Sequence, residues 1–209
     1  MTTHATLQTT SDLGLIGHVA GTIADQQVRN RGTIGGSLAH GDPASDLPAV
    51  IIAHGGAVTV QGSGGQREIH ARDLAQDYLT TAIAPGEVLT EIRVEALDDY
   101  GWGYRKMHRR AEDWAMVAVS ALVLARDGMC EDVRIGLTHM GSVPMRAEAS
   151  EQALRGQPLD AARIAEAGDQ AAEGTDPPGD LNATPDYKAH LARVLCRRAL
   201  EDAAGMGGR

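Results

Sequence analysis

The residues of this chain whose types and spacing could do chemistry gather in the stretch VRNRGTIGGSLAHGDPASD, which runs from Val28 to Asp46. Three glycines in it, Gly32, Gly35 and Gly36, can adopt positive φ and, because they lack a Cβ, leave room for a ligand beside the backbone. Successive free N–H groups in such a turn can form a concave anion-binding site. The pattern therefore predicts a loop shaped to hold a negatively charged group.

Polar side chains beside the glycines add further binding groups. Thr33 and Ser37 carry hydroxyl donors, and Arg29 and Arg31 bring positive charge. Together these groups suit a diphosphate or a similar extended polar ligand. The stretch has no Lys-Ser or Lys-Thr pair after the glycines and no GxGxxG pattern, so it is neither a Walker A loop nor a dinucleotide fingerprint. On residue types alone, a tight connection between two elements remains the alternative.

Three polar residues follow the glycines, and each has a structural and a functional interpretation. Asp46 either caps a helix that begins at Leu47 or accepts hydrogen bonds from ligand hydroxyls. Asp42 precedes a proline and is typical of a turn. His40 has no second histidine at metal-ligand spacing, so we expect it to make structural hydrogen bonds and expect no metal site.

The elements that position this stretch form a first α+β unit, which ends at about Glu95. Apolar residues such as Leu15, Ile16 and Val19 recur at helical spacing and predict a helix over residues 11–25. A buried helix should follow over 46–56, because Pro48 suits its first turn and two glycines end it. We further expect a hairpin over 57–71, a short helix over 71–79 and a strand within 84–96.

The chain changes character at residues 97–100 and continues as three strands and two helices. We expect strands over 101–110, 114–126 and 131–141 and helices over 160–174 and 184–204. In the third strand, Val133, Ile135 and Leu137 alternate with less apolar residues, which is the pattern of a half-buried strand. Thr184 and Pro185 are typical of a capped helix start.

Composition and charge exclude several classes of protein. The chain has 209 residues and a formal charge of −9, so we expect no nucleic acid or anionic membrane partner, which would need a basic face. Cys130 and Cys196 lie far apart, which fits a reducing compartment and excludes a cysteine-ligated iron–sulfur cluster within this chain. The start lacks an export pattern, and the longest apolar run, 115–125, is too short for an integral membrane segment. We expect a cytoplasmic location.

The glycine stretch, extended to VRNRGTIGGSLAHGDPASDLPA, resembles the flavin-binding medium subunit of the molybdenum-containing hydroxylases. This family includes aerobic carbon monoxide dehydrogenase and bacterial xanthine dehydrogenases. The family's TIGGS-like loop reads Thr33 to Ser37 here, and its DPxxD-like turn reads Asp42 to Asp46. APGEVLTEIRV, GYRKMHRRAEDWAMV and DYKAHLARVLCRRAL resemble later family segments in the same order. The resemblance covers nearly the whole chain.

The resemblance implies an α+β fold in two parts. Residues 1–97 correspond to the second subdomain of a PCMH-type FAD-binding domain. Residues 98–209 correspond to a carbon monoxide dehydrogenase flavoprotein C-terminal-like domain, with a three-stranded antiparallel sheet plus helices. The family's first flavin subdomain carries its own glycine loop, which we do not find here, and MTTHATL resembles an internal family segment. We therefore expect the N-terminal flavin subdomain to be missing from this chain.

The resemblance also implies FAD as the cofactor and assigns its contacts by position. The TIGGS loop would wrap FAD with amide and hydroxyl groups, and Asp46 matches an aspartate that contacts FAD. We expect neither a catalytic residue nor a metal ligand in this chain. The implied contacts are Ile23, Arg31, Gly32, Thr33, Ile34, Gly35, Gly36, Ser37, Asp46, Leu89 and Lys106.

Two of the residues on the expected strand over 101–110 have interpretations that need no cofactor. Lys106 could be a solvated charge at the edge of a sheet. Tyr104 could lie against the flavin or pack in the core, and we favour packing.

The function implied by the resemblance is that of an FAD-binding electron-transfer subunit of an oxidoreductase. A large subunit with a molybdenum cofactor would oxidise the substrate, and a small subunit with 2Fe-2S clusters would pass electrons to the flavin and on to an external acceptor. The three subunits would form a heterotrimer that dimerises. The alternative is a flavin-free docking or scaffold subunit, or a non-functional fragment, and flavin content distinguishes these possibilities.

Overall fold

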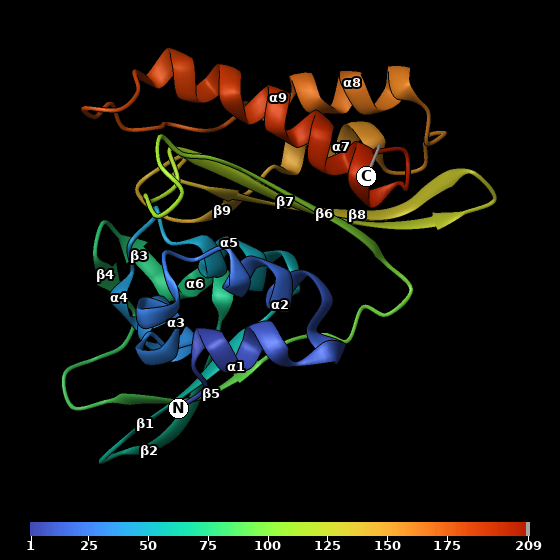
Figure 1. The fold of residues 1–209 in the computed structure, drawn as a ribbon. Coiled ribbons are helices and arrows are strands. Elements are labelled where there is room, and N and C mark those ends of the chain that lie inside the picture. The colour runs from blue at the N-terminus through green and yellow to red at the C-terminus, as the bar shows by residue number, and fades with distance from the viewer. Residues whose placement is uncertain (208–209) are drawn as a thin grey trace.

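The computed structural model describes residues 1–207, which form two packed halves joined by the segment 94–100. In Figure 1 the first half, coloured blue to green, lies below the second half, coloured yellow to red. Each half combines helices with an antiparallel sheet, which confirms the predicted α+β class. Within these residues, every helix is too short or too polar to cross a bilayer.

Short helices build most of the first half, and three of them, α1, α3 and α4, begin with a side-chain cap. Thr3 Oγ1 accepts a hydrogen bond from Thr6 N at 3.1 Å, and Asp25 Oδ1 accepts one from Val28 N at 2.8 Å. Such caps satisfy amides that a helix of one or two turns leaves without partners. The helices are α1 (His4–Thr9), the 3₁₀ turn η1 (Ser11–Leu13), α2 (Gly14–Gly21), α3 (Gln26–Arg31), α4 (Ile34–His40), α5 (Asp46–Ala53) and α6 (Ala71–Leu74).

A three-stranded antiparallel sheet completes the first half, in the order β2-β1-β5. The predicted hairpin is confirmed, with Val58 opposite Ile69 and a turn at residues 62–65. Val60 lies opposite Leu89 of β5 on the other side. The strands are β1 (Ala57–Gly62), β2 (Gly65–His70) and β5 (Val88–Arg93), and a separate small pair consists of β3 (Ala75–Asp77) and β4 (Thr80–Thr81).

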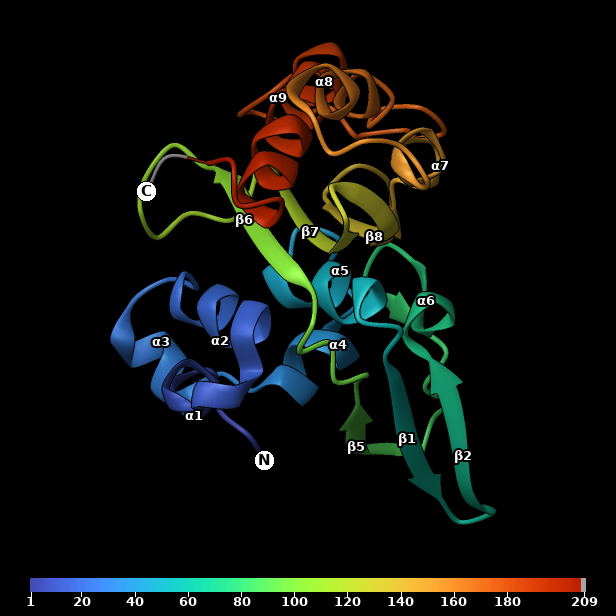
Figure 2. The same ribbon diagram turned by 90° about the vertical axis from the view of Figure 1, so that its right-hand side faces the viewer.

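The second half is one antiparallel sheet in the order β6-β7-β8-β9, covered by helices. The three predicted strands are confirmed, and the two-residue β9 extends the sheet beyond them. Figures 1 and 2 show α8 and α9 on one face of this sheet and the helices of the first half on the other. The elements are β6 (Gly101–Met107), β7 (Val117–Arg126), β8 (Met129–Thr138), β9 (Met145–Arg146), α7 (Glu148–Leu154), α8 (Ala161–Asp169) and α9 (Pro185–Ala203).

The helix α5 lies at the centre of the molecule, between the two halves. All of its residues are buried, as expected for a helix enclosed on every side. A Cβ added at Gly136 of β8 would overlap the carbonyl group of Ala49, so α5 packs directly on the second sheet. Because Asp46 is the first residue of α5, this packing places its carboxylate at the junction of the halves.

Several elements differ from the sequence-based expectations. The stretch 28–46 contains the helices α3 and α4 rather than one extended loop, and none of its three central glycines has positive φ. The helix expected over 11–25 is only α2, because Gly14 has φ of +42° and separates it from η1. The helices α1 and α7 were not expected from the sequence. The helix expected over 71–79 ends at Leu74 and continues as β3.

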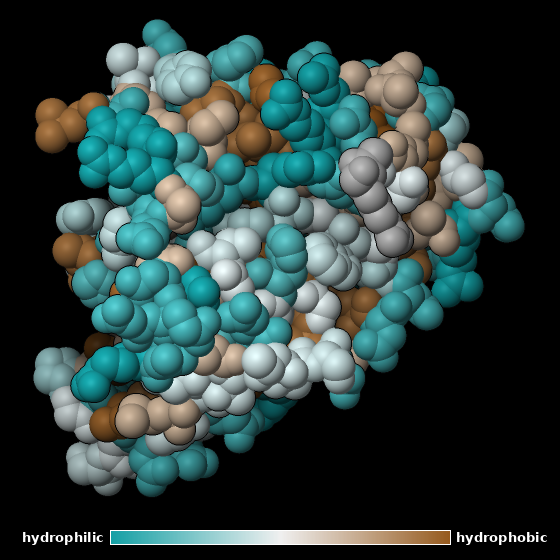
Figure 3. Space-filling view, in the orientation of Figure 1, coloured by the Kyte–Doolittle hydropathy of each residue, from teal (hydrophilic) through white to brown (hydrophobic). Residues whose placement is uncertain are grey.

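The surface in the orientation of Figure 1 mixes polar and apolar residues. Figure 3 shows hydrophilic residues over much of this face, with hydrophobic residues in small, separate patches. No broad apolar surface is visible on this side of the described residues, so the concave regions between elements are the candidates for binding sites.

Candidate functional site

A buried polar cluster joins the first residue of α5 to the strand β6. Lys106 Nζ donates a hydrogen bond to Asp46 Oδ2 at 2.8 Å, and Tyr104 Oη donates one to Asp46 Oδ1 at 2.9 Å. The side chains of Lys106 and Asp46 are 6% and 8% exposed. Lys106 is therefore not a solvated edge charge, and Tyr104 packs as favoured but also makes a directed polar contact.

The cluster holds Tyr104 in its protonated form. Burial raises the pKa of Tyr104 well above its usual value, and the negative charge of Asp46 raises this pKa further. The phenol consequently acts as a hydrogen-bond donor over the physiological pH range. Asp46 itself does not cap α5, because Ser45 is the capping position and makes no side-chain cap. Its carboxylate instead accepts bonds across the junction between the halves.

The glycine stretch forms the first turn of α4 and the residues before it. Thr33 caps α4, because its Oγ1 accepts a hydrogen bond from Gly36 N at 3.0 Å. The glycines provide close approach rather than positive φ. A Cβ at Gly32 would lie 2.8 Å from the ring of His4, and one at Gly36 would lie 3.0 Å from Thr33 Oγ1. Gly32 thus lets α1 pack against the stretch.

Two cavities meet at this turn. The first, of about 730 Å³, contains the polar cluster and is called the Asp46 cavity. The second, of about 670 Å³, lies against β5 and is called the Leu89 cavity. Thr33 and Gly36 line both of them. Figure 2 shows α4 between the helices α1–α3 and the strand β5, which explains why its first turn separates the two spaces.

Every implied contact residue lines one of the two cavities. Those in the Asp46 cavity are Ile23, Arg31, Gly32, Thr33, Gly36, Ser37, Asp46 and Lys106. Those in the Leu89 cavity are Thr33, Ile34, Gly35, Gly36 and Leu89. The structure therefore brings Asp46 and Lys106 together in one wall and places Leu89 on the opposite side of α4.

The two arginines before the glycines differ in their surroundings. Arg29 Nη1 donates hydrogen bonds to the carbonyl oxygens of Ile23 and Ala24, each at 2.8 Å. This guanidinium therefore holds the chain between α2 and α3. Arg31 is exposed and lines the Asp46 cavity, so only the second arginine is placed to meet a ligand.

Sequence reasoning missed several residues of the Asp46 cavity, of which Trp114 and His4 are the most notable. Trp114 lines it with 59% of its surface exposed, and it lies eight positions after Lys106 in the loop between β6 and β7. An exposed aromatic residue after a strand that carries Lys106 was a signal available in the sequence. His4 also lines the cavity, and its buried Nδ1 has no hydrogen-bond partner among the described residues. Burial lowers the pKa of His4, which favours the neutral ring.

Asp42 behaves as its structural interpretation predicts, whereas the side chain of His40 makes none of the expected hydrogen bonds among the described residues. Asp42 Oδ1 accepts a hydrogen bond from Ala44 N at 2.8 Å, which confirms the turn. His40 is exposed and its Nε2 lies 4.0 Å from Asp42. Among residues 1–207, no group of three or more His, Cys, Asp and Glu side chains could hold a metal ion.

The chemistry of the two cavities fits FAD. The Asp46 cavity offers hydroxyl groups, a carboxylate and the cations Arg31 and Lys106, which suit a diphosphate and a polyol. The Leu89 cavity offers apolar side chains, including Ile16 and Ile83, which suit an aromatic ring. Gly35 and Gly36, in the first turn of α4, add no side chain beyond those of Thr33 and Ile34 at the boundary between the cavities.

Comparison with known proteins gives two family matches, one in each half of the chain. Residues 1–95 match the family described as the FAD binding domain in molybdopterin dehydrogenase. Residues 102–203 match the CO dehydrogenase flavoprotein C-terminal domain. These matches confirm the predicted order of a flavin-binding part followed by a C-terminal part.

Individual relatives are similar over most of this chain. It is 38% identical over 182 residues to the carbon monoxide dehydrogenase medium chain of Afipia carboxidovorans, covering 87% of this chain and 63% of that protein. It is 33% identical to the nicotine 6-hydroxylase medium subunit of Paenarthrobacter nicotinovorans, covering 97% of this chain and 73% of that subunit. The solved structure of reconstituted CO dehydrogenase from Oligotropha carboxidovorans superposes with a TM-score of 0.94 at 35% identity, covering 99% of this chain and 74% of that chain.

Proposed function

Because this chain belongs to the family of FAD-binding medium subunits of the molybdenum hydroxylases, we propose that it binds FAD across the first turn of α4 and serves in electron transfer. FAD supplies redox chemistry when it is bound. The chain's own residues bind the cofactor, orient it and set the charge around it. The observation that carries the proposal is that Thr33 and Gly36 line both the Asp46 cavity and the Leu89 cavity.

Each group at the turn has a proposed role. Arg31, Thr33 and Ser37 would bind polar parts of FAD, and the absence of a Cβ at Gly35 would let the cofactor approach the backbone. Gly32 and Gly36 instead give room to His4 and to the hydroxyl of Thr33, which line the cavity beside the cofactor. Ile34 and Leu89 would contact it on the side of β5, and Ile23 on the side of the Asp46 cavity. These roles follow the chemistry of the lining residues.

The pair of Asp46 and Lys106 would present one fixed charge pattern to the cofactor. Asp46 accepts bonds from Lys106 and Tyr104, so its carboxylate is oriented before any ligand arrives. Such preorganisation lowers the entropic cost of binding. Lys106 would place a positive charge where negative charge collects on a diphosphate or a reduced flavin ring.

The assembly around this chain is also a proposal. Relatives are a carbon monoxide dehydrogenase medium chain and a nicotine 6-hydroxylase medium subunit. By analogy, we expect a small subunit with 2Fe-2S clusters and a large subunit with a molybdenum cofactor, in a heterotrimer that dimerises. The boundary between the two domains would lie at residues 97 and 98, which the joining segment 94–100 supports.

Titration of the 209-residue chain with FAD tests the proposed binding. We expect saturable binding of one FAD per chain. Quenching of the fluorescence of the exposed Trp114 measures this binding. Gly35→Ala should weaken binding by about tenfold, because the new methyl group occupies space that the cofactor needs. A Cβ at Gly35 would lie 3.6 Å from Leu89, an ordinary contact, so the fold should tolerate this change.

The matched control is Gly64→Ala, where a Cβ would meet no atom within 4 Å. This variant should bind FAD as the unchanged chain does. If Gly35→Ala bound FAD as tightly as the unchanged chain, the cofactor would have to bind away from the first turn of α4. A folded chain with no saturable FAD binding would contradict the proposal and favour a flavin-free docking subunit.

A further inference from the structure

A third cleft lies outside both cavities of the candidate flavin site, and its lining is rich in arginine. It has a volume of about 570 Å³ and lies between the end of α5 with α6 on one side and β8 with β9 on the other. The four arginines come from α6, β8, β9 and the residue after α7. The lining residues are Ile52, Gly55, Gly56, His70, Arg72, Glu95, Asp132, Arg134, Arg146 and Arg155.

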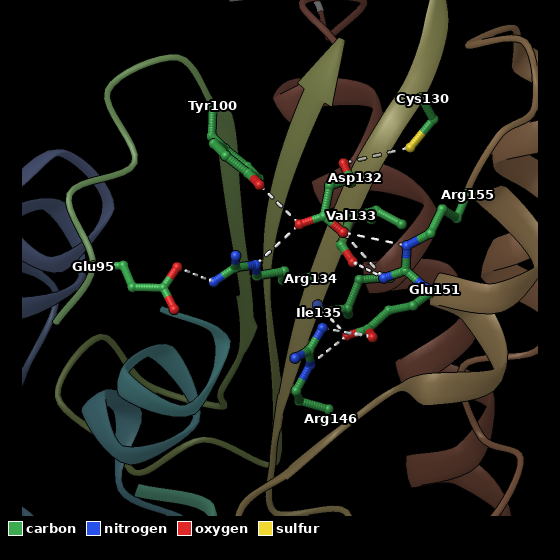
Figure 4. A network of polar contacts seen from close by, with 10 residues as sticks. All are labelled: Glu95, Tyr100, Cys130, Asp132, Val133, Arg134, Ile135, Arg146, Glu151 and Arg155. Carbon is green, nitrogen blue, oxygen red and sulfur yellow. Dashed lines mark hydrogen bonds and ion pairs between the residues drawn. The ribbon is translucent and has the colours of Figure 1, made fainter. Parts of the chain in front are cut away.

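Carboxylates hold three of these arginines in place, as Figure 4 shows. Arg134 Nη1 donates to Glu95 at 2.7 Å and its Nε donates to Asp132 at 3.1 Å. Arg155 Nη2 donates to the other oxygen of Asp132 at 3.1 Å. These contacts tie the joining segment to β8 and fix the directions in which the guanidinium groups point.

The third positioned arginine belongs to a pair beneath the cleft. Arg146 donates from Nε and Nη2 to the two oxygens of Glu151 at 2.8 and 2.7 Å. The side chain of Glu151 is only 5% exposed, whereas that of Arg146 is 18% exposed and lines the cleft. The buried Glu151 therefore holds the guanidinium of Arg146 on one side, while its other side is open to the solvent in the cleft.

The ion pairs leave donor capacity unused. Arg134, Arg146 and Arg155 each bind carboxylates through Nε and one Nη, and within residues 1–207 the remaining Nη has no acceptor. Arg72 is exposed and makes no ion pair with any residue that the structure describes. Four guanidinium groups thus face three carboxylates, those of Glu95, Asp132 and Glu151. The cleft is locally positive in a chain whose formal charge is −9.

We propose that this arginine cleft binds a small oxyanion that carries two or more negative charges, through phosphate or carboxylate groups. The guanidinium fork matches the oxygen pairs of both groups, and partly buried, oriented arginines lose little freedom when they bind. Arg72 supplies the charge that the carboxylates of the cleft do not neutralise. The ligand would lie near the end of α5, whereas the Asp46 cavity lies at its start, so it would not compete with FAD.

Calorimetric titration of the 209-residue chain with orthophosphate and, separately, with citrate tests this site at constant ionic strength. We expect saturable binding of at least one of the two anions, and the anion that binds identifies the group recognised. Arg72→Ala should weaken that binding by about tenfold, because one charge-assisted contact is lost. This change breaks no ion pair of the described structure, so the fold should persist.

Arg198→Ala provides the matched control, because Arg198 is an exposed arginine of α9 that lies outside every cavity described above. It should leave anion binding unchanged. Three results would overturn the proposal: neither anion binds, Arg72→Ala binds as tightly as the unchanged chain, or Arg198→Ala weakens binding equally. The second result would place the anion elsewhere, for example beside Arg31 and Lys106 in the Asp46 cavity.

Discussion

At the scale of single residues, Asp46 connects the structure of the chain to its proposed function. Its carboxylate is 8% exposed, yet it accepts hydrogen bonds from both Lys106 and Tyr104. A buried charge of this kind is tolerated because it is paired and hydrogen-bonded. The same carboxylate lines the Asp46 cavity, so one residue both joins the two halves and places a charge in the wall of the proposed FAD site.

Removing the hydroxyl of Tyr104 tests this double role. Tyr104→Phe should destabilise the chain by about 1.5–3 kcal/mol, because Asp46 loses a donor in a buried position. The free energy of unfolding in urea measures the effect. Tyr78→Phe is the control, since Tyr78 is 61% exposed, and it should change this free energy little. Equal effects of the two variants would show that the bond between Tyr104 and Asp46 contributes nothing.

At the scale of elements, close backbone approach determines how the long helix α9 lies on its sheet. A Cβ at Gly101 would overlap the carbonyl of Ala203, and one at Gly103 would overlap that of Ala199. Both glycines are on β6, two residues apart and therefore on the same face. This contact sets the height of α9 above the strand that carries Tyr104 and Lys106.

Adding one methyl group to this contact should therefore be costly. Gly103→Ala forces α9 away from β6, and we expect a loss of at least about 2 kcal/mol of stability. Urea unfolding followed by circular dichroism measures this loss. Gly64→Ala, where a Cβ would have open space, serves as the control. If Gly103→Ala were as stable as the unchanged chain, α9 would have to pack less closely on β6 than the structure shows.

At the scale of the whole molecule, the two halves share one set of contacts around α5. Besides the Asp46 cluster, His139 N donates to Pro43 O at 2.9 Å, and Arg134 pairs with Glu95 at 2.7 Å. Leu47 of α5 is fully buried in the core cluster of the first half, which also includes Leu122 of β7. Neither half can expose this helix without losing much of its apolar burial. The chain should therefore unfold as one unit.

A substitution in the first half should consequently be detected in the second. Leu47→Ala should lower the stability by about 2–5 kcal/mol. Trp102 and Trp114 lie in the second half and its loop, and their fluorescence gives one midpoint of unfolding. This midpoint should shift together with the midpoint of unfolding measured by far-UV circular dichroism. Val88→Ala, at a residue that is 64% exposed, is the control. Separate midpoints for the two probes would contradict a single cooperative unit.

Local patterns in the sequence determined much of the fold, because burial leaves a periodic trace along each element. The alternation from Val133 to Leu137 predicted a strand that is now β8, and Thr184 with Pro185 predicted the start of α9. The glycines were recognised as a place of close approach. The conformation of the glycines was not predicted, because the helix caps Asp25 and Thr33 turn the same stretch into two short helices.

By itself, the sequence predicted which residue types would meet a ligand: the hydroxyls and glycines of Thr33–Ser37 and a carboxylate at Asp46, with a cation at Lys106 implied by the family resemblance. Only the tertiary structure decided how they are arranged. Asp46 and Lys106 lie 60 positions apart, and they pair because α5 packs against the sheet that contains β6. Leu89 is separated from them by α4, because α4 packs against both α5 and β5. Such contacts depend on the packing of distant elements, which no local pattern records.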